Sequence, residues 1–194
     1  MTKEAVLITG ANGEIGHGLI DYLQQSCDYE ILALDIQPLD EMLSGACHQF
    51  IQGDILDVNL LDDISNRFSI RTIFHLASLL STGAEKRPEL AHNVNVNGTF
   101  NLLKMADKLG EKSGHPTKFI YPSSIAAYGL PGPEGKVVAG KVREDSISPT
   151  ASPCTVSTNC IARTWVAILW VIMDRSAPKA PARMSIFVPC GSQD

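Results

Sequence analysis

The sequence predicts an α/β fold in which helices cover both faces of a doubly wound parallel sheet with strand order 3-2-1-4-5. Three observations predict it. A short apolar segment near the start of the chain runs into a glycine-rich turn, a second apolar segment ends in an acidic residue, and strand-like and helix-like segments then alternate.

The first predicted unit is strand, glycine turn and helix. Residues 5–8 form a short buried strand, Gly10, Gly13 and Gly16 follow three residues apart, and Leu19, Ile20 and Leu23 continue at helical spacing. Glycines allow the backbone to turn tightly and approach a ligand, and a helix N-terminus offers free N–H groups. The unit therefore predicts a pyrophosphate-binding loop.

The second predicted strand, residues 30–34, ends at Asp35, which comes 19 residues after Gly16. A carboxylate at this place accepts hydrogen bonds from the adenosine ribose hydroxyls of a dinucleotide and repels a 2′-phosphate. The position therefore favours NAD over NADP. The alternative is an ordinary solvated aspartate in a loop.

The remaining segments continue the alternation. Apolar residues Leu60, Leu61 and Ile64 share one face of a predicted helix, and Pro88 is a favourable first residue for a long helix. The predicted elements are a short helix over 38–45, a strand over 47–52, a helix over 57–67, a strand over 71–75, a helix from 88 to about 109 and a strand over 118–121.

Composition excludes several classes of function. The net charge of −5 argues against a nucleic-acid partner. The longest apolar run, residues 165–173, is too short for a membrane span, and no signal peptide is recognisable. The five cysteines form no Cys-x-x-Cys pair, so no metal site is predicted and a reducing cytoplasmic location is expected.

The chain changes character after residue 150. All four tyrosines precede this point, whereas both tryptophans, Trp165 and Trp170, follow it. Residues 151–194 show little helical or strand periodicity. We therefore divide the chain into a dinucleotide-binding domain, residues 1–150, and an aberrant irregular tail, residues 151–194, which leaves the sheet incomplete on its C-terminal side and lacks a substrate domain.

Residues 4–150 resemble the extended short-chain dehydrogenase/reductases, the NAD-dependent epimerase/dehydratase group with a Rossmann-type fold. The motifs that carry the resemblance are Thr9-Gly-x-x-Gly-x-x-Gly16, Asp35, Gly53-Asp54, His75-Leu-Ala-Ser78, Asn95-x-Asn-Gly-Thr99 and Tyr121-Pro-Ser-Ser-x-x-x-Tyr-Gly129. Within the group, the segments 75–81 and 121–127 are most similar to the L-threonine 3-dehydrogenase branch.

The resemblance implies NAD as cofactor and hydride transfer from a small hydroxy or amino acid such as L-threonine. Two alternatives stay open: a nucleotide-sugar epimerase or dehydratase, and a truncated, catalytically dead NAD-binding module or pseudogene product. For the intact family member a homodimer is compatible with the resemblance.

The resemblance also implies roles for single residues. The pyrophosphate would be held by Gly10, Gly13, Glu14, Ile15 and Gly16, the ribose by Asp35, and the adenine by Asp54 and Ile55. The path to the nicotinamide ribose would be lined by Leu76, Ala77 and Ser78. Asn95 would be a polar anchor in the long helix, or simply satisfy nearby backbone. Ser124 would be the catalytic serine that orients the reacting group.

The family's general base is a tyrosine made more acidic by a lysine four residues on, and this pair is missing. The residues four positions after Tyr22, Tyr29, Tyr121 and Tyr128 are not lysines. His75 is not expected to replace the base, since it lies at a strand end where packing or local hydrogen bonding is more usual. Because the ordinary pKa of tyrosine is about 10, the side chain needs such a cationic neighbour to act as a base at neutral pH.

A frame error explains the missing pair. The family places it after Ser148-Pro-Thr150, where this chain reads Ala-Ser-Pro-Cys-Thr-Val-Ser-Thr-Asn. If the third base of each codon is read with the next two, the codons from Pro153 onward permit Met-Tyr-Gly-Val-Asn-Lys-Leu-Tyr. The same shift permits Asp-Val-Asp-Phe-Arg-Ser-Leu-Arg-Phe from Arg183. These two strings look like the active-site helix and sixth strand of the family.

Overall fold

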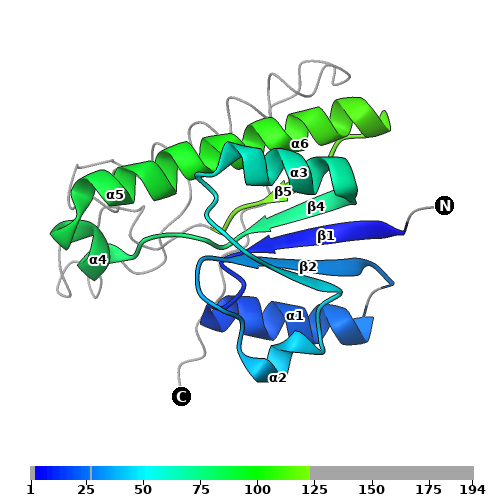
Figure 1. Ribbon diagram of the computed structural model, residues 1–194, viewed down its shortest axis with the longest axis horizontal. Helices are drawn as coiled ribbons and strands as arrows, with labels where there is room; N and C mark the ends of the chain where they lie inside the picture. Colours follow the sequence, from blue (N-terminus) through cyan, green and yellow to red (C-terminus); the bar gives the residue numbers. More distant parts are fainter. Residues whose placement is uncertain (1–2, 27, 123–194) are drawn as a thin grey trace, which may run out of the picture.

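The structure is a computed structural model that describes residues 3–26 and 28–122. These residues form one parallel sheet of five strands in the order β3-β2-β1-β4-β5, which confirms the predicted order (Figure 1). The strands are β1 (Glu4–Thr9), β2 (Glu30–Asp35), β3 (Gln49–Gln52), β4 (Ser69–His75) and β5 (Lys118–Ile120).

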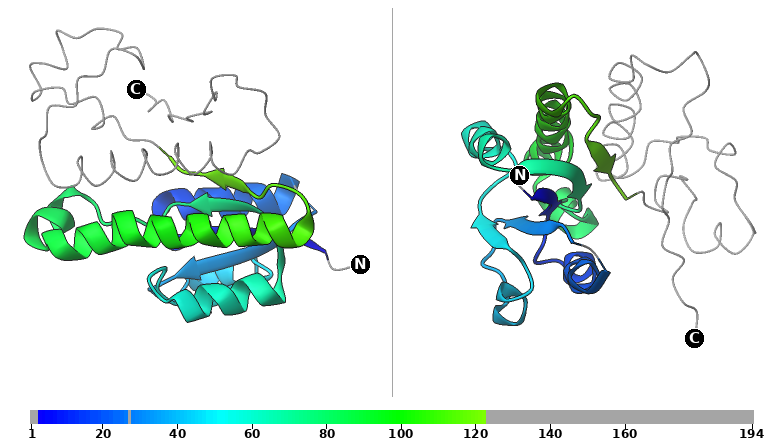
Figure 2. Two further views of the ribbon diagram at one scale, coloured as in Figure 1. Left: turned by 90° about the horizontal axis from the view of Figure 1, so that it is seen from above. Right: turned by 90° about the vertical axis from the view of Figure 1, so that its right-hand side faces the viewer.

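Helices cover both faces of this sheet, as Figure 2 shows. One face carries α1 (Glu14–Ser26) and α2 (Glu41–Ser44), and the other carries α3 (Val58–Arg67) and α6 (Thr99–Ser113). Between β4 and α6 the chain forms α4 (Ser81–Lys86), α5 (Pro88–His92) and a π-helical segment, η1 (Asn93–Gly98). Among the described residues, none of these helices has the length and apolar character that crossing a bilayer requires.

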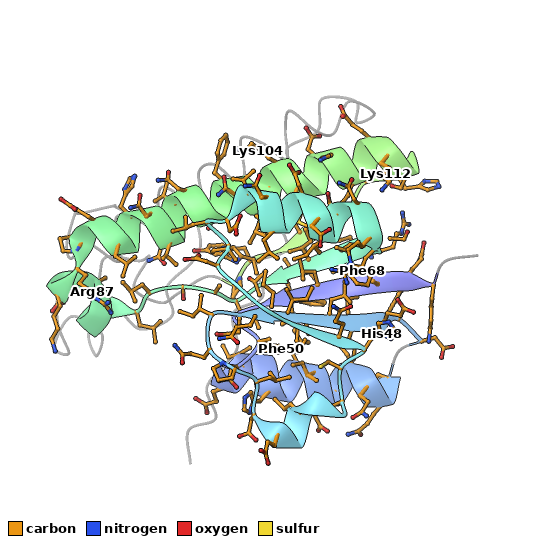
Figure 3. All side chains as sticks on the ribbon, in the orientation of Figure 1. His48, Phe50, Phe68, Arg87, Lys104 and Lys112 are labelled. Atoms are coloured by element: carbon orange, nitrogen blue, oxygen red, sulfur yellow. The ribbon has the colours of Figure 1, made fainter. Side chains whose placement is uncertain are left out.

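The two faces of β1 build two separate cores, because successive side chains of a strand point to opposite sides. Leu7 belongs to the core under α3 and α6, whereas Val6 and Ile8 belong to the core under α1. Phe68 packs against the first core and Phe50 against the second, on opposite sides of the sheet (Figure 3). Burial on both faces explains why β1 and β2 are continuous apolar runs in the sequence.

The ends of α3 and α6 are fixed by local chemistry. The Asp57 carboxylate accepts hydrogen bonds from the backbone N–H groups of Asn59 and Leu60 and so caps the start of α3. Gly114 ends α6 in the left-handed conformation, with φ of 72°. Position 114 therefore sets the end of the helix four residues beyond the last apolar residue of its periodic pattern, Leu109.

The single helix predicted from residue 88 to about 109 is wrong in detail. The structure has α5, η1 and α6 in succession, and the helical segment runs to Ser113. An apolar pattern at helical spacing does not distinguish a π-helical turn from an α-helical one. Gly98 lies so close to Ile55 that a Cβ atom there would come within 2.4 Å of the Ile55 Cδ1.

Other predicted boundaries differ by one to three residues. The short second helix covers only Glu41–Ser44, β3 begins at Gln49 rather than at residue 47, and β5 ends at Ile120 rather than at 121. β4 begins earlier than predicted, at Ser69. Residues 123–194, which include Ser124 and the predicted tail, lie outside the described residues.

Candidate functional site

The predicted dinucleotide-binding residues meet at the carboxyl edge of the sheet. From β1 the chain crosses one face through α1 to reach β2, whereas β4 lies on the other side of β1 and is reached from β3 through α3. Neighbouring strands whose connections leave in opposite directions form a crevice at their carboxyl ends, which is where open α/β sheets bind ligands. The loop after β1 and the loop after β4 are the walls of this crevice.

The glycine loop passes too close to its neighbours for a side chain. Gly10 has φ of 69°, and a Cβ atom there would lie 2.6 Å from the backbone nitrogen of Ala77. A Cβ atom on Gly16 would lie 2.4 Å from the carbonyl oxygen of Ala11. At Gly13 the nearest atom, the carbonyl oxygen of Gly10, would be 3.3 Å away. The predicted glycines therefore form a tight backbone cradle at the start of α1.

The first turn of α1 supplies the groups that suit a pyrophosphate. The helix begins at Glu14, directly after the cradle, and its first N–H groups lack partners within the helix. Ile15 is 58% exposed and Glu14 is exposed as well. Backbone N–H groups at a helix N-terminus are a general site for phosphate groups. The cradle and helix start together fit the phosphates of a dinucleotide.

Asp35 is held rigidly beside the glycine loop. Its Oδ2 accepts a hydrogen bond of 2.9 Å from the backbone N–H of Asn12, and its Oδ1 accepts one of 2.9 Å from that of Gln37. Each carboxylate oxygen offers about two acceptor positions. One position on each oxygen thus remains for the adjacent hydroxyl groups of a ribose. The carboxylate is therefore fixed in place rather than moving in solvent.

The predicted adenine contacts divide between side chain and backbone. Asp54 is exposed, and its carboxylate accepts a hydrogen bond from the backbone N–H of Leu56 at 2.9 Å. Ile55 is only 4% exposed, and its side chain packs in the core against Gly98. Because the Ile55 side chain is in the core, only the backbone of Ile55 is left to flank the adenine as predicted.

The opposite wall is the segment 76–78. The backbone N–H of Leu76 donates to the carbonyl oxygen of Thr9 at 3.0 Å, and that of Ala77 donates to the Thr9 hydroxyl at 3.4 Å. Ser78 follows at the end of this segment. These bonds hold the wall against β1, so Ala77 lies directly over Gly10.

His75 lies beneath this wall and is fully buried. Its Nδ1 is 2.8 Å from the hydroxyl of Thr9, and its Nε2 is 2.8 Å from the hydroxyl of Thr99, which donates its own proton to the carbonyl oxygen of Asn95. The Thr99 hydroxyl therefore accepts from Nε2–H, and Nδ1 accepts from Thr9. Burial lowers the pKa of His75 to about 3. The neutral ring is a structural link between β1 and the start of α6, and both of its nitrogens are hydrogen-bonded.

Asn95 is a buried residue of η1 that bonds to the loop after β4. Its side chain is 1% exposed, its Oδ1 accepts from the backbone N–H of Leu79 at 2.8 Å, and its Nδ2 donates to the carbonyl oxygen of Leu79 at 3.1 Å. This contact is the second of the two alternatives, in which Asn95 satisfies nearby backbone, and its role in cofactor binding stays a prediction. It satisfies the backbone of the loop after β4 and fixes that loop to η1.

Sequence reasoning missed Asn12 and Thr99 as parts of the site. The hydrogen bonds that tie them to Asp35, Asp40 and His75 join residues 23 or more positions apart, which periodicity cannot reveal. The expected catalytic Ser124 lies outside the described residues, which end at Pro122. The ring of Tyr121 stacks on His75 with centroids 5.3 Å apart. Within residues 3–26 and 28–122, no three His, Cys, Asp or Glu side chains are grouped to hold a metal ion.

We expect the buried neutral His75 to make stability depend on pH. Its pKa is about 3 in the folded protein and about 6.5 when unfolded, so between these values the unfolded chain binds more protons. Stability is then lost as the pH falls below 6.5, by up to about 1.4 kcal/mol per pH unit. Urea unfolding between pH 7.5 and 5 should show a weaker pH dependence for His75→Gln than for the wild type. Identical pH dependence in both proteins would contradict the assignment.

The sequence of this chain is similar to known dinucleotide-dependent proteins. The NAD dependent epimerase/dehydratase family matches residues 6–167. The mitochondrial L-threonine 3-dehydrogenase of Bos taurus is 34% identical over 134 residues, which are 68% of this chain and 34% of that protein.

Two solved structures show the same fold. A monomeric L-threonine 3-dehydrogenase from a metagenome database has a TM-score of 0.66 at 30% identity, and the match covers 87% of this chain and 50% of that one. MoeE5 in complex with UDP-glucose and NAD has a TM-score of 0.68 at 26% identity, and the match covers 85% of this chain and 48% of that one. The chain thus spans a third to a half of the length of these proteins.

Proposed function

The chain belongs to the NAD dependent epimerase/dehydratase family, and on this premise we propose that it is the NAD-binding part of an oxidoreductase acting on a small hydroxy or amino acid such as L-threonine. The observation that carries the proposal is the fixed Asp35 carboxylate beside a glycine cradle that has no room for side chains. A pyrophosphate on the cradle and a ribose on Asp35 are two parts of one dinucleotide.

The charges around Asp35 favour NAD. The segments 35–40 and 52–57 contain no lysine or arginine, and they carry the carboxylates of Asp35, Asp40, Asp54 and Asp57. A 2′-phosphate placed there would meet negative charge without a counter-ion from these segments. The bound NAD would supply the acceptor for a hydride from the substrate. Among this chain's own residues, Asp35 would hold the ribose, and the glycine cradle keeps side chains away from the place of the pyrophosphate.

The substrate class rests on similarity. The likeness to the L-threonine 3-dehydrogenases of Bos taurus and of the metagenome supports an amino or hydroxy acid. A second candidate, a nucleotide-sugar epimerase or dehydratase, is supported by the likeness to a protein solved with UDP-glucose and NAD. Because the chain spans at most about half of these proteins, the substrate, a homodimer and the whole enzyme's activity are parts of the proposal.

The division at residue 150 and the frame error after it also remain proposals. They rest on the composition of residues 151–194 and on the strings that the shifted reading permits. On this view the chain as written is a dinucleotide-binding module without its base. The cytoplasmic location expected from the cysteines stays a prediction as well.

The cofactor assignment is tested by Asp35→Ala. We expect NAD affinity to fall by about 10- to 100-fold, because two hydrogen bonds to a charged group are lost, and NADP affinity to fall less or to rise. Calorimetric titration of both cofactors into the 194-residue chain measures the ratio. Asp107→Ala, which removes an exposed carboxylate on α6, is the matched control. An unchanged NAD to NADP ratio in Asp35→Ala would refute the role of Asp35.

A further inference from the structure

Asn12 ties both ends of the segment that follows β2. Its backbone N–H donates to Oδ2 of Asp35, at the start of the segment, and its Oδ1 accepts from the backbone N–H of Asp40, at the end, at 3.2 Å. A single residue of the glycine loop thus closes the segment 35–40 into a ring. Within that ring, Gln37 donates its backbone N–H to the other oxygen of Asp35.

The orientation of the Asn12 amide follows from its donors. A backbone N–H can only donate, so the atom that faces Asp40 is the carbonyl oxygen. The same Oδ1 lies 3.2 Å from Nε2 of His17, which therefore donates to it from the opening turns of α1. Three segments meet at this one oxygen: the glycine loop, α1 and the turn before α2. From the sheet side, Gln52 Nε2 donates to the carbonyl oxygen of Ile36 at 3.2 Å.

We propose that Asn12 is a specificity-determining residue that positions Asp35 and the segment 36–40 for NAD. This inference rests on the proposed function. The backbone N–H of Asn12 holds the Asp35 carboxylate in the orientation that leaves one acceptor position on each oxygen. The Asn12 side chain holds the other end of the segment through the N–H of Asp40, and so prevents residues 36–40 from moving outward to admit a 2′-phosphate. Asn12 therefore acts through Asp35 and is a positioning residue.

The Asn12 side chain does not hold the glycine loop itself. The cradle itself is held by backbone contacts, since Gly10 N–H donates to the carbonyl oxygen of Leu34 at 3.0 Å and Gly13 N–H donates to that of Gly10 at 3.1 Å. Neither bond uses the Asn12 side chain. Removing that side chain should therefore disturb the ribose end of the site and spare the phosphate end, which both cofactors share.

The test is calorimetric titration of NAD and NADP into the wild-type chain, Asn12→Ala and Asn59→Ala. Asn59 is an exposed asparagine at the start of α3 and is the matched control. We expect NAD affinity to fall about 3- to 10-fold in Asn12→Ala and NADP affinity to change by no more than about 2-fold, so that the preference for NAD narrows. Asn59→Ala should keep both affinities.

Hydrogen exchange provides a second readout that does not depend on ligand. The backbone amide of Asp40 should exchange faster in Asn12→Ala than in the wild type. In His17→Ala, which removes one of the two donors to Asn12 Oδ1, the increase in exchange rate should be smaller. His17→Ala replaces Asn12→Ala in this test if the latter fails to fold. Equal losses for both cofactors, an unchanged preference or an unchanged Asp40 exchange rate overturns the inference alone. A wild-type chain that binds neither dinucleotide overturns both the inference and the proposed function.

Discussion

The 194-residue chain is expected to form no NADH from NAD and L-threonine, whereas a frame-restored, full-length version is expected to be active. No tyrosine in the chain is followed four residues later by a lysine, and burial lowers the pKa of His75, which lies beneath the site, to about 3. Loss of a general base alone removes about 10²–10⁴ in rate. Steady-state assays of both proteins with L-threonine and related hydroxy acids measure the difference.

Two controls make this result specific. In the restored enzyme, replacing the regained tyrosine by phenylalanine should return the rate to that of the 194-residue chain. The nucleotide sequence across codons 145–200 gives an independent check, because a stop codon in the shifted frame soon after codon 153 would exclude the frame error. Comparable turnover by the unrestored chain would show that the missing pair is not needed and would refute the prediction.

Gly10→Ala is expected to abolish dinucleotide binding and to destabilise the fold. The new Cβ would lie 2.6 Å from the backbone nitrogen of Ala77, and the backbone keeps φ of 69°. Left-handed strain and overpacking together cost roughly 2–5 kcal/mol of unfolding free energy. The atoms that the new Cβ would meet are backbone atoms of Leu76 and Ala77, so rotating a side chain cannot relieve the clash. Urea unfolding and NAD titration measure the two effects.

Gly18→Ala is the matched control for this substitution. Gly18 lies in α1, and a Cβ atom there would meet nothing within 4 Å among the described residues beyond its own helix, so alanine adds no clash. In a helix interior, alanine is favoured over glycine by about 1 kcal/mol, and the control should be at least as stable as the wild type. Gly10→Ala with wild-type stability and NAD affinity would show that the loop after β4 can move away from the cradle.

Local patterns predicted the centre of the sheet because β1 and β2 are buried on both faces and the turn after β1 has unusual backbone demands. The apolar runs of β1 and β2, the glycine spacing and the acid at the end of β2 are all visible within single segments. The alternation of strands and helices also fits other doubly wound orders, and the order 3-2-1-4-5 is the one of the Rossmann-type fold that the resemblance implies. Boundaries such as the end of α6 depend on one residue, Gly114, and are easily misplaced.

The supporting residues of the site could not be predicted in the same way. Thr9, His75 and Thr99 form one hydrogen-bonded chain across two strands and a helix, and Asn12 bonds to Asp40, 28 residues later. Such contacts exist only once the sheet has formed, so no short window contains them. The role of Ser124 stays a prediction, because it lies outside the described residues.

The π-helical turn of η1 makes the length of this part of the chain as important as its composition. Each residue of an α-helix advances about 100° around the axis, so deleting one residue from 93–98 would rotate α5 relative to α6 by about that angle. Asn95 could then no longer face Leu79 while Thr99 faces His75. Homologous sequences should therefore keep the number of residues in this segment, and a one-residue gap in an alignment at this position would mark a protein whose cofactor loop is held differently.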